Sequence, residues 1–154
     1  MADSMYIDYK KLEIWQMAYD FVLQIYGTVE KFPKYEENNI TSQLRRAATC
    51  LPLNIAEGSG ARSHKIFLNY LIFAYRSVRE TETLLMLSKE LKYFDEAEYS
   101  RLWCALDLFT RKLVAYMNYL EKDVIKYDRK KDLSHFYRHH KSAIDRRESI
   151  GKLA

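Results

Sequence analysis

Small and apolar residues recur at alternating intervals of four and three between residues 63 and 91, and this spacing constrains the chain more than any other feature. The series is Phe67, Leu71, Ala74, Val78, Thr81, Leu85 and Ser88. Residues spaced in this way share one face of an α-helix, so the segment predicts a long helix with a coiled-coil-like seam. Four further apolar residues widen that face: Leu68, Ile72, Tyr75 and Leu84. A face of this width is typical of a helix that contacts more than one neighbour.

Three other segments show helical periodicity. The first spans about residues 11–31, and its apolar face is Leu12, Trp15, Ala18, Val22, Ile25 and Val29. The second follows the capping-type residues Asn38 and Asn39 and ends at the glycines 58 and 60; its face is Ile40, Leu44, Ala47, Ala48, Leu51 and Ile55. The last spans about residues 95–126, with Asp95 as the expected N-cap; its face is Tyr99, Leu102, Trp103, Leu106, Phe109, Leu113, Met117, Leu120 and Val124.

Short links separate these four predicted helices. Only four glycines and two prolines are present, and Pro33 and Pro52 have different consequences. Pro33 ends the first helix, whereas Pro52 lies inside the second and predicts a kink, either shaping an interface or merely tolerated. Short links favour an all-α, antiparallel up-down-up-down four-helix bundle over residues 11–126. Residues 1–10 are then an N-terminal arm, and residues 127–154 a partly disordered or helical C-terminal extension.

Length and composition fit a single globular domain. The chain has 154 residues, of which 48% are hydrophobic. No apolar run approaches 18 residues, which argues against a membrane span, and the N-terminal MADSMYIDYKK lacks the layout of a secretion signal. We therefore expect a cytoplasmic protein. Cys50 and Cys104 lie within helical patterns, where buried thiols are expected rather than a disulfide.

Positive charge is concentrated in the extension. Residues 1–126 hold 17 basic and 17 acidic residues, whereas residues 127–154 hold 8 basic and 4 acidic ones. Basic residues beside Phe136 and Tyr137 fit contact with nucleic acid, through phosphate pairing and base stacking. The candidates are Arg129, Lys130, Lys131, Arg138, Arg146 and Arg147. The alternative is a solubilising or partly disordered end, and the sequence leaves both open.

Four more cations lie on or just after the second helix. Arg45 and Arg46 are adjacent within it, and Arg62 and Lys65 follow its glycine stop. Guanidinium groups grip phosphates with two parallel hydrogen bonds, so these residues are candidates for nucleic-acid binding. The alternative is pairing with carboxylates of the bundle such as Glu36 or Glu57. On the third helix, spacing predicts internal pairs between Arg76 and Glu80 and between Arg79 and Glu82.

Asn54, Glu57 and Gly58 form a candidate structural turn. We expect Gly58 to adopt the left-handed conformation that closes a helix, and the two polar residues to hold the turn into the third helix. A catalytic role for Glu57 is disfavoured because no second carboxylate or base lies at a useful spacing. The sequence also lacks a Glu-x-x-His pair, so no bundle-core metal or cofactor is predicted.

Two segments read in order resemble a known family. LEIWQMAYDFVLQIYGTVEKFP, followed by QLRRAATCLPLNIAEGSGARS, is similar to the 23S ribosomal RNA intervening-sequence proteins, whose relatives include Avd, an accessory protein of diversity-generating retroelements. The resemblance continues through FLNYLIFAYRSVRETETLLMLSKELKYF and covers roughly residues 11–123. It implies a ring-like homopentamer of four-helix bundles. In the Avd branch it also implies association with a reverse transcriptase and RNA.

The sequence therefore predicts a non-enzymatic, oligomeric protein that associates with nucleic acid or with a nucleic-acid enzyme. The alternative is a structural or protein-interaction oligomer, of the intervening-sequence type, that makes no direct contact with RNA.

Overall fold

A computed structural model describes the backbone of residues 7–151 and the side chains of residues 7–127 and 129. Its regular elements over these residues are all helical. They are η1 (Tyr9–Lys11), α1 (Glu13–Val29), η2 (Lys34–Glu36), α2 (Ile40–Ser59), α3 (His64–Glu90) and α4 (Glu96–Gly151). The four α-helices begin within a few residues of the predicted positions.

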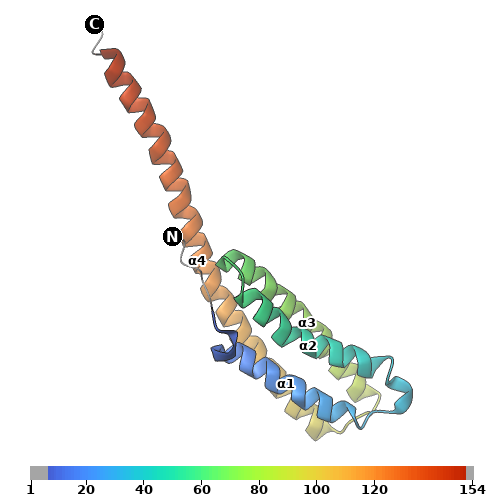
Figure 1. Ribbon diagram of the computed structural model, residues 1–154. Coiled ribbons are helices and arrows are strands. Elements are labelled where there is room, and N and C mark those ends of the chain that lie inside the picture. The colour runs from blue at the N-terminus through green and yellow to red at the C-terminus, as the bar shows by residue number, and fades with distance from the viewer. Residues whose placement is uncertain (1–6, 152–154) are drawn as a thin grey trace.

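Each long helix packs against two others, and together they form a four-helix bundle (Figure 1). α1 and α3 both lie against α2 and against α4. Two contacts show which parts of the chain meet. The hydroxyl of Thr28, at the end of α1, donates to Glu98 Oε1 near the start of α4, 2.5 Å away. His64 Nδ1, at the start of α3, lies 3.7 Å from Asp123 Oδ2, well along α4.

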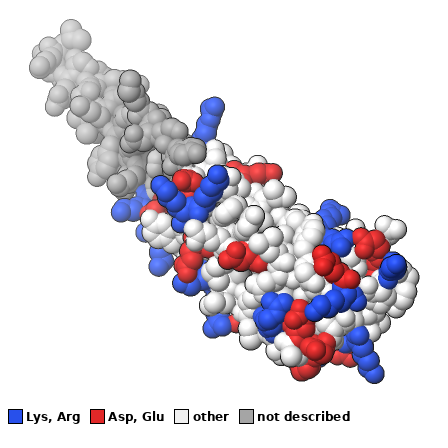
Figure 2. Space-filling view, turned by 60° about the horizontal axis from the view of Figure 1, so that its bottom comes forward, with Lys and Arg blue, Asp and Glu red and all other residues white. Residues whose placement is uncertain are grey.

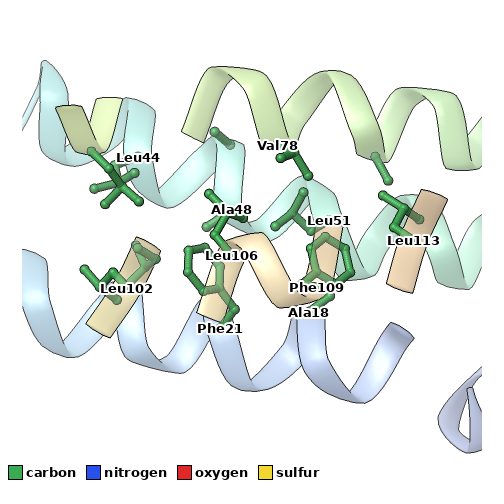
Figure 3. Packing of buried hydrophobic residues seen from close by; sticks show 14 of the residues in the cluster. Ala18, Phe21, Leu44, Ala48, Leu51, Val78, Leu102, Leu106, Phe109 and Leu113 are labelled. Carbon is green, nitrogen blue, oxygen red and sulfur yellow. The ribbon is translucent and has the colours of Figure 1, made fainter. Parts of the chain in front are cut away.

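The predicted apolar stripes account for most of the core. All seven residues of the α3 stripe are buried, and so are all six of the α2 stripe. Side chains from the four helices meet between them; Figure 3 labels Phe21, Leu44, Val78 and Phe109 among them. The α1 stripe is only partly right, because Ile14 and Phe21 are buried while Leu12, Trp15 and Val22 are half-buried. α1 packs against both α2 and α4, so its buried face differs from the predicted stripe and includes Ile14 and Phe21.

Side chains cap three of the helices. Ser63 Oγ accepts a hydrogen bond from the Ile66 amide of α3, and Asp95 Oδ1 accepts one from the Glu98 amide of α4, as predicted for Asp95. At α2 the capping residue differs from the expected asparagines. Asn39 makes no side-chain cap, and the carboxylate of Glu36 instead accepts from the Ile40 amide at 3.2 Å.

The left-handed conformation predicted for Gly58 is wrong. Gly58 lies inside α2, which ends at Ser59, and no described glycine has a positive φ. Its importance comes from packing: a Cβ on Gly58 would lie 2.5 Å from Phe67 Cδ2 and 2.7 Å from Tyr70 Cβ. The absence of a side chain therefore allows α2 and α3 to approach closely. α2 also runs through Pro52 without ending.

α4 does not end near Lys126 as expected. It continues to Gly151 as one helix and extends beyond the other three (Figure 1). The physical reason lies in the sequence, because residues 127–150 contain no glycine or proline that would stop a helix. The expectation of two buried thiols is also wrong: Cys50 is half-buried and Cys104 is exposed.

Replacing Gly58 with alanine is expected to destabilise the bundle by about 1–3 kcal/mol, because the added methyl group overpacks the contact with Phe67. Gly27 provides a matched control, since it lies within α1 and its added Cβ would meet nothing within 4 Å. Gly27→Ala should stabilise the protein by about 0.5–1 kcal/mol through helix propensity alone. Urea unfolding of both variants measures the two free energies. Equal stabilisation by the two substitutions would contradict the packing role of Gly58.

Candidate nucleic-acid interface

Five cations gather at the end of the bundle from which α4 continues. We call residues 60–65 and 122–129 the exit end; its two stretches are adjacent, since His64 Nδ1 lies 3.7 Å from Asp123 Oδ2. Its cations are Arg62, Lys65, Lys122, Lys126 and Arg129, and all five side chains are exposed. The same stretches contain only two acidic residues, Asp123 and Asp128. Figure 2 shows lysine and arginine side chains near the point where the described side chains stop.

The opposite end has the reverse charge balance. We call residues 30–39 and 90–98 the far end, where the links between α1 and α2 and between α3 and α4 lie side by side. It contains seven carboxylates and three lysines. A hydrogen bond 2.7 Å long from the Tyr93 hydroxyl to Glu36 Oε1 joins the two links. The bundle is therefore neutral as a whole but separates its charges along its length.

The cations of the exit end also differ from those on the helix walls in their partners. None of the five lies within 4.0 Å of a described carboxylate, whereas most cations of the walls are paired. The wall pairs are Arg45–Glu37, Arg79–Glu82, Lys89–Glu96, Arg101–Glu98, Arg111–Asp107 and Lys112–Glu13. The predicted pair of Arg79 with Glu82 is confirmed at 2.7 Å, but Arg76 and Glu80 do not pair in the described structure.

Arg45 and Arg46 do not belong to the exit end. Arg45 Nη1 lies 2.6 Å from Glu37 Oε1, and its guanidinium stacks over the ring of Tyr26 at 5.5 Å. Its Nε is buried and has no hydrogen-bond partner within the described part of the chain. Arg45 thus joins α1, α2 and the link between them, as the alternative of pairing with a carboxylate expects, and its contact with nucleic acid stays a prediction. Arg46 is exposed, but the rise of α2 separates it from the exit end by roughly 20 Å.

The predicted cations of the extension lie only partly within the described structure. Arg129 is exposed on α4, close to the bundle. The helix continues through the other positions, whose side chains lie outside the described residues: Lys130, Lys131, Arg138, Arg146 and Arg147. Lys122 and Lys126 were not predicted. Their spacing of four residues just before Arg129 and Lys130 is the signal that would have identified them.

The candidate turn at residues 54–58 is held mainly by backbone groups. Asn54 Nδ2 donates to the Cys50 carbonyl at 2.7 Å, so this side chain bonds within α2 and not across to α3. The Glu57 side chain is exposed, while its carbonyl accepts a hydrogen bond from the Gly60 amide at 3.2 Å. A second backbone bond, from the Ala61 amide to the Gly58 carbonyl, completes the turn that leads to Arg62.

A cleft of about 360 Å³ lies at the far end, between the end of α1 and the start of α4. Its central polar group is the carboxylate of Glu98, which binds Arg101 at 2.8 Å and Thr28 at 2.5 Å. These hydrogen bonds, that of Arg101 first, lower the pKa of Glu98 from 4.5 to about 2. The carboxylate is thus already satisfied by the protein, and it serves to connect α1 with α4.

Glu36 connects the two links of the far end. Its carboxylate accepts hydrogen bonds from the Tyr93 hydroxyl, the Ile40 amide and the side-chain amide of Asn39. The bond from Tyr93, followed by that from Ile40, lowers the pKa of Glu36, and the same contact raises the pKa of Tyr93. Two negatively charged groups at the far end are therefore stabilised in their ionised form.

Other functional features were sought in the described residues. No helix among them is both long enough and apolar enough to cross a bilayer. Within the same residues, no three side chains of His, Cys, Asp or Glu are grouped so that they could bind a metal ion.

The fold and this distribution of charge define a helical-bundle protein with a basic end and a long terminal helix. The chain belongs to the 23S rRNA-intervening sequence protein family, whose model matches residues 10–115. It is also similar in fold to the crystal structure of a protein of unknown function from the S23 ribosomal protein family of Bacteroides thetaiotaomicron, with a TM-score of 0.61 and 22% sequence identity. That match covers 97% of the relative and 68% of this chain, so this chain contains additional length. Comparison with curated proteins gives no match.

The stability of the bundle is expected to fall in acid, because the lowered pKa of Glu98 links ionisation to folding. Its contribution is complete above about pH 4.5 and is lost as the pH falls toward 2. Glu98→Gln should therefore lower the free energy of unfolding at neutral pH, and the difference from wild type should shrink below about pH 4.5. Urea unfolding across this pH range measures the effect. Glu57→Gln, at an exposed carboxylate, is the control, and an equal pH dependence in both variants would contradict the assignment.

Proposed function

We propose that this chain is a non-enzymatic, oligomeric protein of the cytoplasm that binds RNA through its exit end. The observation that carries the proposal is the group of five exposed cations there, none of which is paired with a described carboxylate. An unpaired cation can exchange its counterions for a phosphate without first breaking an ion pair. The helix that leaves this end also carries the charge excess of the chain.

Membership of the family suggests the context of this binding. The resemblance to Avd points to association with a reverse transcriptase as well as with RNA. The exit end suits RNA, because arginine and lysine side chains on separate segments can follow a phosphate backbone. A reverse transcriptase is proposed as a partner from the family resemblance alone. The acidic far end does not overlap the proposed RNA surface, so it is available to such a partner.

We further propose that the helices run up-down-up-down and that the bundles close into a homopentameric ring. The contact of Thr28 with Glu98, which joins the end of α1 to the start of α4, supports the helix directions. Exposed apolar side chains support assembly. Tyr19, Leu23 and Tyr26 share one face of α1, which we call the α1 outer face, and Leu23 is 57% exposed. Further exposed apolar residues lie on α2 and α3, including Leu53, Ile66, Phe73 and Leu87.

This exposed apolar surface also favours a second function: a structural or protein-interaction oligomer without RNA contact. Both functions require self-association through the apolar faces. Only the first requires the exit end to bind RNA. Binding measurements on the exit end therefore decide between them.

Substitution of Arg62 and Lys65 by glutamine should weaken RNA binding and make it less dependent on salt. Each phosphate-binding cation removed should reduce the magnitude of the slope of log K against log salt by about 0.7 for single-stranded RNA, so the double substitution should reduce it by about 1.4. Fluorescence anisotropy with labelled RNA, in full-length protein at several salt concentrations, measures both effects. Arg111→Gln is the matched control, because Arg111 is exposed on α4 but paired with Asp107.

The triple variant Arg129→Gln, Lys130→Gln, Lys131→Gln tests the extension in the same assay. Because Arg129 belongs to the exit end, the double variant Lys130→Gln, Lys131→Gln is measured beside it, and loss of affinity in that double variant, with binding by the Arg62 and Lys65 variant unchanged, would move the RNA site away from the bundle. If wild-type protein fails to bind RNA even at low salt, the RNA function is wrong and the structural oligomer takes its place.

Leu23→Lys is expected to weaken self-association, because it places a charge on the α1 outer face. Sedimentation velocity over a range of protein concentrations should show a smaller particle than wild type. Ser100→Lys adds the same charge at an exposed polar position of α4 and should leave the particle unchanged. Wild-type protein that sediments as single chains at every concentration would be evidence against the ring.

A further inference from the structure

Tyr127 occupies an unusual position on α4. The apolar stripe of this helix follows the spacing Leu113, Met117, Leu120, Val124 and Tyr127, with intervals of four and three. Leu113 and Leu120 are 0% and 1% exposed, Val124 is half-buried, and Tyr127 is 69% exposed. The stripe is uncovered step by step because α4 continues where the other helices have ended (Figure 1). Tyr127 thus continues the core stripe with little protein around it.

The stripe does not remain apolar after Tyr127. Continuing the same spacing along the sequence gives Lys131, Ser134 and Arg138. A helix that packs against a second copy needs apolar residues at these positions over several turns. The sequence instead changes from apolar to polar and basic residues after Tyr127, so the core stripe of the bundle does not continue along the extension.

Cations outnumber carboxylates in the stretches around Tyr127, whose two acidic residues are Asp123 and Asp128. Lys126 and Arg129 are exposed on the same turn of α4. Arg62 and Lys65 follow α2 at the same end of the bundle, where His64 Nδ1 lies 3.7 Å from Asp123 Oδ2 of α4. These cations have no carboxylate partner among the described side chains. An exposed aromatic ring beside cations is the combination that binds single-stranded nucleic acid, since a base stacks on the ring while the cations bind its phosphates.

We propose that Tyr127 stacks on an unpaired base of single-stranded RNA whose neighbouring phosphates contact Arg62, Lys65 and Arg129. This inference rests on the proposed RNA function and specifies its ligand as unpaired RNA. A double helix keeps its bases stacked on one another, so it cannot offer a base face to Tyr127. The cations attract both kinds of RNA, and Tyr127 makes the distinction between them.

Three substitutions of Tyr127 test the stacking. Tyr127→Phe keeps the aromatic ring and should bind a labelled single-stranded RNA as wild type does. Tyr127→Ala and Tyr127→Leu remove the ring and should both weaken binding on the order of tenfold, because leucine restores apolar bulk but not a stacking face. Their salt dependence should equal that of wild type, since every phosphate-binding cation is still present. Tyr119→Ala, which changes another exposed tyrosine of α4, should have no effect.

Two further measurements separate the alternatives. A duplex RNA of the same length should bind wild type and Tyr127→Ala equally. Circular dichroism and sedimentation should show an unchanged fold and particle size, and a smaller particle for Tyr127→Ala would mean that Tyr127 contacts a second copy, which overturns the proposal. Unaltered binding by Tyr127→Ala, alongside weakened binding by the Arg62 and Lys65 variant, would overturn the role of Tyr127 and leave the RNA function intact. Failure of wild type to bind either RNA would overturn both.

Discussion

The close approach of α2 to α3 at Gly58 is the contact on which the arrangement of the exit end depends. A buried glycine there leaves room for the ring of Phe67, and the chain turns into α3 directly afterwards. Backbone hydrogen bonds from Gly60 and Ala61 hold this turn, so Arg62 and Lys65 leave a rigid corner. Because Phe67 also packs against Tyr116, the same ring joins the corner to α4. The position of two proposed RNA ligands is therefore set by apolar packing beneath them.

Charge is organised on this scaffold by pairing. Cations along the walls are mostly matched with carboxylates one helical turn away or on the adjacent helix, as for Arg111 with Asp107 and Lys112 with Glu13. Exposed pairs of this kind contribute little stability, about 0–1 kcal/mol each. Their larger consequence is that the walls present little net charge to a polyanion. The cations of the exit end have no such partner among the described side chains, and this difference supports the proposal that RNA binds at one end of the bundle.

The fold could be predicted from the sequence more completely than the site. The stripes on α2 and α3 are correct because strict spacing of apolar residues reports burial directly. The α1 stripe is less accurate, since spacing alone does not show that α1 packs between two neighbours. A glycine near a helix end, such as Gly58, can serve either to end the helix in a left-handed conformation or to let a neighbouring helix approach closely. Only the position of Phe67 shows that the second explanation holds for Gly58. Pairing of Arg45 with a carboxylate was an open alternative, but its partner could not be identified because Glu37 lies eight residues earlier, outside the spacing of one helix. The neutral total charge of residues 1–126 hides the separation of charge between the two ends.

Different kinds of interaction close the two ends of the bundle, so the two ends should differ in local stability when the pH falls. At the far end Glu36 and Glu98 hold the links through ionised hydrogen bonds. Toward the exit end Phe67 and Leu71 are fully buried in the apolar core, in packing that protons do not alter. Acid should therefore fray the molecule from one side, with amide hydrogens near the links exchanging early and those of the corner at Gly58 exchanging late. The corner that carries Arg62 and Lys65, the proposed RNA ligands, then belongs to the part of the protein that opens last.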